Sequence, residues 1–203
     1  MTLALGTYLQ ERDEAGLALA DDAERIARAC HAVALRFHLG GRLLSFGTGQ
    51  SAADAAHLAV EFVHPVIVGK RALPAFSLAN DASAMSGLAR AGLFATQLRL
   101  LGRAGDIAVG ITIDEDCDNE DCHGEDCDEV AAGLAVAREM GMTTVALTKA
   151  GGLGSAVVDH LLTARSRDPR VARELQMTTY HVLWELVHVF LNDPRLAATE
   201  VSR

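Results

Sequence analysis

Hydrophobic and polar positions follow two periods along the chain. Some segments repeat apolar residues every three to four positions, as amphipathic helices do, and others are short apolar runs bounded by Gly or Asp, as buried strands are. We expect two helices over residues 2–38, the second starting at Asp21-Asp22, and further helices near 52–63, 83–101, 128–140 and 170–192. We expect strands at 42–46, 71–79, 107–112, 143–149 and 159–164.

The order of these elements predicts the fold class. Strands that alternate with helices indicate an α/β protein with a parallel sheet covered by helices on both faces. No linker interrupts the pattern, so we predict a single domain over 1–203, with residues 1–40 as a helical N-terminal extension. A chain of this length can bury a sizeable core.

Composition narrows the function classes. Half of the residues are apolar and only 4% are aromatic, which suits packed Ala- and Leu-rich helices. No apolar run reaches the roughly 18 residues of a membrane span, and the N-terminus lacks the basic start and apolar core of a signal peptide. We therefore expect a cytoplasmic protein without a membrane partner. No basic stripe is present, so we expect no nucleic-acid partner.

One segment departs from this ordinary composition. The stretch DEDCDNEDCHGEDCDE, residues 114–129, holds ten of the 27 acidic residues and no Lys or Arg. The formal net charge of −9 is therefore a local property. Three of the four cysteines lie in the same stretch, whereas Cys30 falls in a helical Ala-rich segment and is expected to be buried. We predict an acidic, Cys-rich loop at 114–129.

Three interpretations of this loop stay open. Dense like charge favours a solvated loop without a ligand. The second interpretation is a metal site formed by Cys117, Cys122, His123 and Cys127 with nearby carboxylates, since such ligands suit zinc, nickel and other divalent ions. The cysteines are five positions apart, about 140° round a helix, so only a loop would bring them together. The third is a redox switch, although neighbouring carboxylates should raise the pKa of the thiols.

Two strand ends carry candidate chemistry: the turn after 42–46, and the acidic run after 107–112. The turn GTGQS, comprising Gly47, Thr48, Gly49, Gln50 and Ser51, follows a strand and opens a helix, so its N–H groups and the Ser51 hydroxyl could hold an anion. His57 and Glu61 are four positions apart, which places both on one helix face. The turn also fits a dinucleotide fingerprint, which normally opens a domain and has an acid at the end of the next strand, about 20 residues on. Here about 40 helical residues precede the turn, and the next strand ends only near Asn80-Asp81, so the match is weak.

These residues carry a resemblance to a known family. GTGQSAADAAHLAVEFV resembles the G-N-G-G-S-A-A-D-A-Q-H-x-x-x-E-L segment of sugar isomerase (SIS) domain proteins, most closely those of the phosphoheptose isomerase branch. KRALPAFSLAND, LLGRAGDIAVGI, AREMGMTTVALT and YHVLWELVH follow in the family's order. The resemblance covers about residues 5–192. It implies a three-layer sandwich with a flavodoxin-like parallel sheet, assembled as a homodimer or homotetramer with active sites shared between subunits.

The resemblance also implies roles for individual residues. Ser51 matches a phosphate-binding serine, His57 a zinc ligand, and Glu61 a ligand that is also the acid or base. His181 matches the second catalytic and metal-binding group. A carboxylate and an imidazole can move the proton that aldose–ketose isomerisation requires, while a divalent metal, expected to be zinc, polarises the carbonyl.

The chain departs from the family at several positions. The family's second phosphate loop, G-I-S-T-S-G-N-S, is replaced by GITIDEDCDNED, which keeps Thr112 as its hydroxyl. The family's glutamine ligand, eight positions before the last histidine, is Arg173, which cannot ligate a metal but could bind an anion. Thr48 and Gln50 replace an Asn and a Gly, and a G-N-D-x-G-F stretch is shortened to about 88–94.

Two classes of function follow. In the first, the protein isomerises a phosphorylated sugar, with His57, Glu61 and His181 around a metal and the 47–51 turn and Thr112 at the substrate. In the second, those side chains are an idle remnant and the protein is non-catalytic, binding a metal or a protein partner through the acidic loop.

Other polar residues have less specific interpretations. Lys70 and Arg71 could bind a phosphate, or they could only keep the start of a strand hydrated. The remaining histidines are expected to be structural or on the surface: His31, His38, His160 and His188.

Overall fold

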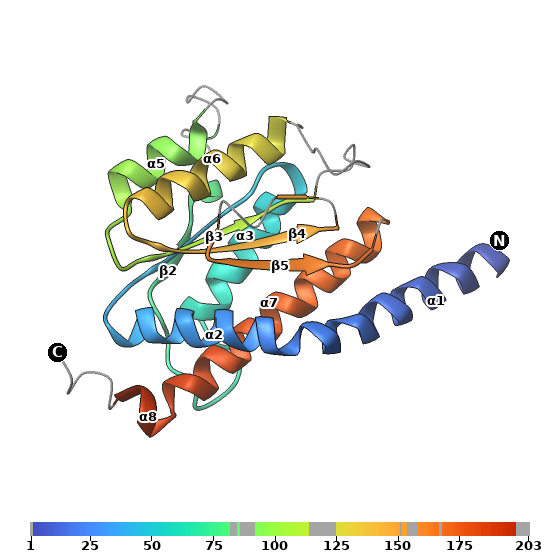
Figure 1. Ribbon diagram of the computed structural model, residues 1–203, viewed down its shortest axis with the longest axis horizontal. Helices are drawn as coiled ribbons and strands as arrows, with labels where there is room; N and C mark the ends of the chain where they lie inside the picture. The colour runs from blue at the N-terminus through green and yellow to red at the C-terminus, as the bar shows by residue number, and fades with distance from the viewer. Residues whose placement is uncertain are drawn as a thin grey trace.

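The computed structural model describes residues 2–81, 85, 92–113, 125–150, 152–153, 158–166 and 168–197. A parallel sheet lies between layers of helices (Figure 1). The strands are β1 Leu43–Phe46, β2 Ala75–Ser77, β3 Ile107–Ile111, β4 Thr143–Lys149 and β5 His160–Ala164. The helices are α1 Thr2–Ala18, α2 Ala23–His38, α3 Gly49–Val63, α5 Leu93–Leu101, α6 Glu125–Glu139, α7 Pro169–Leu191 and α8 Pro194–Ala197, with short 3₁₀ turns at Leu19–Asp22 and Leu78–Asn80.

The sheet has the strand order β2-β1-β3-β4-β5, and every pair is parallel. This is the doubly wound order of flavodoxin-like folds. The predicted α/β sandwich with a parallel flavodoxin-like sheet and a helical N-terminal extension is therefore confirmed. The order reverses between β1 and β3, and the loops after these strands leave the same edge of the sheet. In open α/β sheets, such a reversal is where ligands bind.

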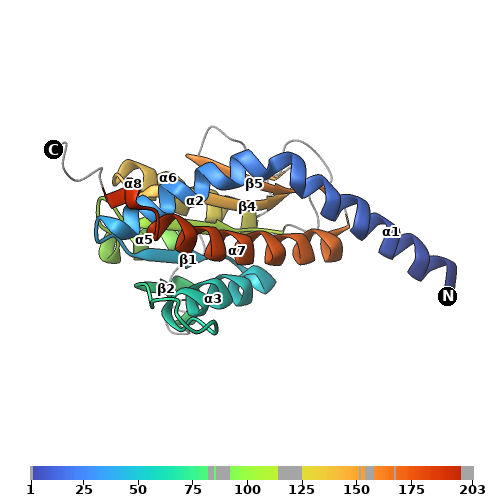
Figure 2. The same cartoon turned by 90° about the horizontal axis from the view of Figure 1, so that it is seen from below.

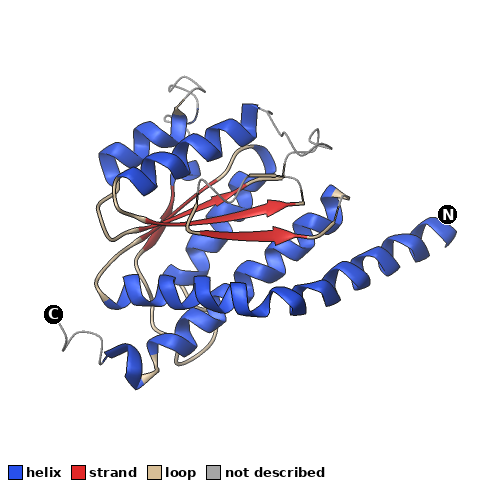
Figure 3. Ribbon diagram, viewed as in Figure 1, coloured by secondary structure: helices blue, strands red, loops and turns tan. Residues whose placement is uncertain are grey.

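The core is divided between the two faces of the sheet. Successive residues of β1 show this, because Leu43 packs with α2, α3 and α7 while Leu44 packs with α5 and α6. Figure 3 shows the helices on both sides of the sheet. Both faces are covered by helices, so the strands are mainly apolar, as parallel strands usually are. None of the described helices is long and apolar enough to cross a bilayer.

Several predicted boundaries were wrong. The strand expected at 71–79 covers only Ala75–Ser77. Of the helix expected over 83–101, the structure describes α5 from Leu93, and most of 83–91 lies outside the described residues. Helix α6 begins at Glu125, so the end of the predicted acidic loop, 125–129, is helical. Acidic residues favour the first turn of a helix, where they face the positive end of its dipole. Likewise, α3 already begins at Gly49 inside the predicted turn, and α8 was not predicted.

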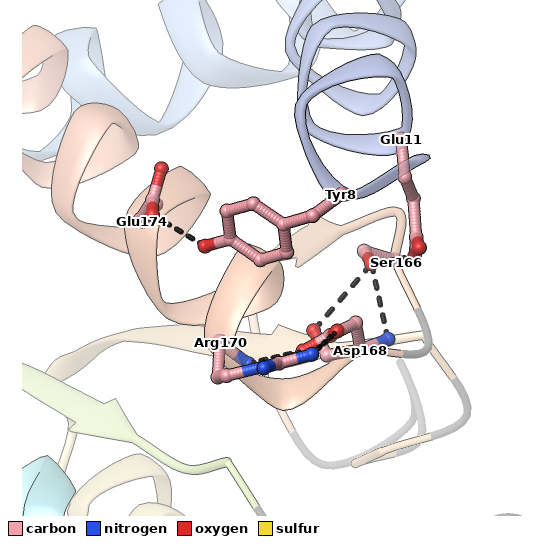
Figure 4. A network of polar contacts seen from close by, with 6 residues as sticks. All are labelled: Tyr8, Glu11, Ser166, Asp168, Arg170 and Glu174. Carbon is pink, nitrogen blue, oxygen red and sulfur yellow. Dashed lines mark hydrogen bonds and ion pairs between the residues drawn. The ribbon is translucent and has the colours of Figure 1, made fainter. Parts of the chain in front are cut away.

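Helix α1 extends from the body of the molecule (Figure 2). Its contact with the start of α7 is largely polar (Figure 4). The Tyr8 hydroxyl donates to Glu174 Oε1 at 2.6 Å, and Ser166 Oγ donates to Glu11 Oε1 at 2.9 Å. Apolar contact comes from Ala15 and Tyr8, which pack with residues of α7 and β5.

Asp168 begins α7 as its N-cap. Its Oδ1 accepts from the backbone N–H of Arg170 at 2.9 Å, and the Arg170 side chain also bonds the carboxylate. The hydrogen bonds from Arg170 lower the pKa of Asp168 from 3.8 to about 2. A carboxylate with a lowered folded-state pKa contributes stability above its unfolded pKa and loses it as the pH falls through the folded value.

We therefore predict that Asp168→Ala lowers the free energy of unfolding by about 1 kcal/mol at pH 7, as loss of an N-cap does. The difference from wild type should narrow as the pH falls from about 4 towards about 2. Urea unfolding across this range measures it. Asp193→Ala, at the N-cap of the four-residue α8, is the matched control and should cost less. If the difference in unfolding free energy between wild type and Asp168→Ala did not change with pH, the role of the ionised Asp168 carboxylate as the N-cap would be contradicted.

Candidate metal and anion site

The ends of β1 and β3 approach each other closely at the point where the strand order reverses. A Cβ added at Gly47 would lie 2.7 Å from the backbone oxygen of Ile111 and 2.8 Å from that of Ser51. Only glycine fits such a gap, because both neighbours are backbone atoms that cannot turn away. Gly47 thus lets the chain leave β1 and enter α3 directly beside β3.

The N-terminus of α3 faces this edge of the sheet. Thr48 is its N-cap, with an extended backbone and no side-chain cap, and Gly49 has a positive φ of 52°. Ser51 lies in the first turn and is buried. The first N–H groups of a helix have no partner within the helix, and the helix dipole favours negative charge there. The turn predicted to bind an anion, residues 47–51, is therefore a helix N-terminus without a side-chain cap, and we call it the anion turn.

The structure brings together the three predicted ligands His57, Glu61 and His181. They come from α3 and α7, and each offers a ligand atom within 4.8 Å of the others. All three are partly exposed, so an ion and a substrate could reach them. Two imidazoles and one carboxylate form a set that catalytic zinc sites use, with a fourth position left for water or substrate. The residues present therefore fit a divalent metal.

Two contacts between α3 and α7 fix this cluster. The Tyr180 hydroxyl lies 2.9 Å from His57 Nδ1, and Trp184 Nε1 donates to the backbone oxygen of Glu61 at 2.8 Å. His57 Nε2 lies 3.1 Å from Glu61 Oε1. Burial raises the pKa of Tyr180, and the negative charges of Asp54 and Glu61 raise it further. The phenol therefore stays protonated at neutral pH.

Arg173 lies across the anion turn. Its Nε is 3.1 Å from Asp54 Oδ2 in an ion pair, and its Nη1 donates to the side-chain oxygen of Gln50. The Nη2 group also donates to the backbone oxygen of Gln50 at 3.3 Å. Asp54 is 5% exposed, so its carboxylate depends on this cation. Arg173 thus brings a positive charge to the turn and is not placed as a metal ligand.

Thr112 lies at the end of β3, on the other side of the reversal point. It is buried, its N–H donates to Leu147 O at 3.0 Å, and its backbone oxygen accepts from Gln176 Nε2 at 3.0 Å. Gln176 therefore ties α7 to the strand end. The predicted role of Thr112 at the substrate stays a prediction.

The acidic run is described only at its end. Cys117, Cys122 and His123 lie outside the described residues, and so does the side chain of Cys127. The metal site predicted from them is therefore untested, although Cys127 is on helix α6 and not in a loop. Glu129, the last residue of the run, is buried and accepts from Gly92 N and Leu93 N at 2.9 Å each. It caps the start of α5 from a neighbouring helix.

Other predicted residues have structural partners. Lys70 Nζ pairs with Glu185 Oε1 at 2.7 Å and lies over the Trp184 ring, away from the anion turn. His188 is buried, with its ring nitrogens at the backbone oxygens of Trp184 and Arg71. Cys30 is fully buried, as predicted, and burial raises the pKa of its thiol to about 12.

Sequence reasoning missed two residues of the site. Asp54 is three positions before His57, so their spacing on one helix face was a usable signal. Tyr180 directly precedes His181, but nothing in the sequence shows that its hydroxyl reaches α3. That contact depends on how the two helices pack.

The fold and site define a parallel α/β sandwich with a helix N-terminus and a His–Glu–His cluster at the edge where the strand order reverses. The model of the SIS domain family matches residues 8–149. The phosphoheptose isomerase of Desulfovibrio desulfuricans is 38% identical over 158 residues, which cover 75% of this chain and 70% of that protein. That of Nitratidesulfovibrio vulgaris is 33% identical over 181 residues, covering 87% and 82%.

A solved structure shares the fold. The phosphoheptose isomerase from Francisella tularensis superposes with a TM-score of 0.80 at 22% identity, covering 93% of this chain and 98% of that one. The chain therefore belongs to the SIS domain family, in its phosphoheptose isomerase branch.

We predict that Arg173→Gln lowers the free energy of unfolding by about 1–3 kcal/mol, because it leaves the Asp54 carboxylate buried without its cation. Asp54→Asn in the same chain should recover part of this loss. Urea unfolding of the two single variants and the double variant measures the coupling. Arg170→Gln is the matched control, since its exposed ion pair should contribute about 1 kcal/mol or less. If the losses of unfolding free energy in the two single variants add up in the double variant, the ion pair between Arg173 and Asp54 would be contradicted.

Proposed function

We propose that this protein isomerises a phosphorylated sugar between its aldose and ketose forms, with a sedoheptulose 7-phosphate type of substrate. The observation that carries the proposal is the meeting of His57, Glu61 and His181 within 4.8 Å, with two of them on the helix that begins at the anion turn. The names of the similar proteins support the same chemistry.

The phosphate end of the substrate is assigned to the anion turn. The N–H groups at the start of α3 and the Ser51 hydroxyl would bind its oxygens, since this helix has no side-chain cap to compete with them. Arg173 already contacts Gln50 in the turn, so its guanidinium would add a positive charge beside the phosphate. The same guanidinium also pairs with Asp54, so the two partners would share its charge.

The reacting end is assigned to the cluster. Glu61 would remove the proton from the carbon next to the carbonyl, and His181 would give a proton to the carbonyl oxygen. Glu61 would then return the proton to the former carbonyl carbon while the second hydroxyl gives up its proton to His181, which forms the new carbonyl and restores both groups. A metal held by His57, Glu61 and His181, which we expect to be zinc, would polarise the carbonyl.

The non-catalytic alternative, in which the acidic run binds a metal or a protein partner, is not favoured by the similarity to phosphoheptose isomerases. The acidic run still limits where a phosphate can bind. Two like charges about 4 Å apart repel by roughly 1–4 kcal/mol near a protein surface. Several carboxylates at the phosphate would prevent its binding, so the run has to lie away from it or hold a cation.

We also propose that the protein works as a homodimer or homotetramer. Exposed valines lie on the two helices that carry the cluster: Val60 and Val63 on α3, Val182 and Val189 on α7. Helix α1 projects from the body (Figure 2), and helices in proteins gain most of their stability from tertiary packing. A second copy packed on these surfaces would bury them. The expected cytoplasmic location stays a prediction.

The test of activity is a turnover assay with sedoheptulose 7-phosphate, with and without zinc, in which the product is followed by proton NMR. We expect zinc-dependent conversion. His181→Ala should lower kcat by about a hundredfold to ten-thousandfold, as loss of an acid–base group does. His31→Ala, an exposed histidine on α2, is the matched control and should keep wild-type turnover. No conversion by the wild type under either condition would refute this substrate assignment.

The proposed assembly predicts the effect of a surface charge. Val182→Asp should shift the protein towards smaller species at equal concentration, because a carboxylate buried in an interface loses its hydration. Leu100→Asp is the matched control, since Leu100 is 78% exposed on α5, across the sheet. Size-exclusion chromatography with light scattering measures the masses. A monomeric wild-type protein would contradict the proposal.

A further inference from the structure

Tyr180 lies between the two helices that carry the metal cluster. Its side chain is fully buried, and its hydroxyl is 2.9 Å from His57 Nδ1. The other ring nitrogen, Nε2, is 3.1 Å from Glu61 Oε1. Protein groups therefore contact both nitrogens of one of the three candidate ligands. The proposed metal site explains why the Glu61 carboxylate lies beside His57, but it does not explain the Tyr180 hydroxyl.

The hydrogen-bond partners determine which nitrogen carries the hydrogen. An ionised carboxylate only accepts, so in a neutral imidazole the hydrogen is on Nε2 and is donated to Glu61. Nδ1 then has a free lone pair, and it accepts from the Tyr180 hydroxyl. His57 is thus expected as the Nε2–H tautomer when Glu61 is its partner.

Metal binding requires the opposite tautomer. A metal takes a nitrogen lone pair, and Nε2 is the nitrogen that faces Glu61. The Nε2 hydrogen leaves to solvent, and a hydrogen from solvent is taken up at Nδ1, so the imidazole stays neutral. Histidines that ligate metals almost always donate their second ring N–H to a partner. The nearest described partner for Nδ1 is the Tyr180 oxygen.

We propose that Tyr180 is a positioning residue that supports both tautomers of His57. Its hydroxyl donates to Nδ1 in the metal-free state, and its oxygen accepts from Nδ1–H when the metal is bound. A hydroxyl can act in both ways, whereas a backbone carbonyl can only accept. This inference rests on the metal site of the proposed function, but it does not depend on the substrate.

The surroundings hold the phenol in place for this role. The Tyr180 ring meets the His181 ring edge-on at a centroid distance of 4.8 Å and the His57 ring at 5.5 Å. The Trp184 bond to the Glu61 backbone fixes the next turn of α7 against α3. The hydroxyl therefore has little freedom to leave Nδ1, and its proton can turn about the C–O bond without movement of the ring.

Tyr180→Phe removes only the hydroxyl and keeps the buried ring. Titration calorimetry with zinc alone should show an affinity about 10–100-fold lower than that of wild type, as loss of a hydrogen-bond partner of a metal ligand does. Tyr8→Phe is the matched control, because Tyr8 is the other of the two tyrosines and its hydroxyl bonds Glu174 at the base of α1. This variant should bind zinc as wild type does.

The tautomer is measured directly by long-range proton–nitrogen NMR of nitrogen-15 labelled histidine. In wild type, His57 should be the Nε2–H form without zinc and the Nδ1–H form with it. Tyr180→Phe should bind less zinc at equal concentration and show a smaller shift to the Nδ1–H form. A merely structural role would lower the melting temperature of the metal-free protein and leave zinc affinity unchanged, which would overturn the inference.

A double variant tests whether Tyr180 acts through His57. Once His57→Ala is present, Tyr180→Phe should cause no further loss of zinc affinity. A full additional loss would overturn the inference, and so would a wild-type protein that binds no zinc. Zinc binding with the expected tautomer change but without isomerase turnover would contradict the proposed function and leave this inference standing.

Discussion

The packing of α3 on α7 is the constraint on which the rest of the site depends. Helix α3 presents His57 and Glu61 on one face, but His181 comes from a helix more than a hundred residues later. Two hydrogen bonds, from Trp184 to the Glu61 backbone and between Tyr180 and His57, hold these helices in register. Because metal ligands have to lie within a few tenths of an ångström of fixed distances, this register decides whether the cluster exists at all.

The sheet decides where that cluster lies. Parallel strands send their following loops to one edge, and the order β2-β1-β3-β4-β5 places the ends of β1 and β3 next to each other. Gly47 allows the closest approach there, since any side chain would meet backbone atoms. The two loops that leave this edge have opposite character. One is the N-terminus of α3, which favours anions, and the other leads into a run of carboxylates.

The charges of the site are balanced by contacts between distant segments. Arg173 from α7 reaches the turn before α3 and the buried carboxylate of Asp54. Glu129, at the end of the acidic run, turns inward and caps α5. One acidic residue of that run therefore stabilises the fold. At the position of the family's glutamine ligand stands Arg173, which pairs with Asp54 and contacts Gln50, so the candidate metal ligands are His57, Glu61 and His181.

The sequence by itself determined the α/β class, the strand–helix order and the pairing of His57 with Glu61, because these follow from local periodicity within one element. It placed the ends of α6 and β2 wrongly, since caps and neighbouring strands decide where an element stops. The resemblance to the family predicted His181 as the third member of the cluster, and the tertiary structure brings it within 4.8 Å of the other two. Only the tertiary structure decided that Arg173 pairs with Asp54 and that Tyr180 meets His57. These contacts join segments far apart in the chain, and their geometry depends on how α3 and α7 pack.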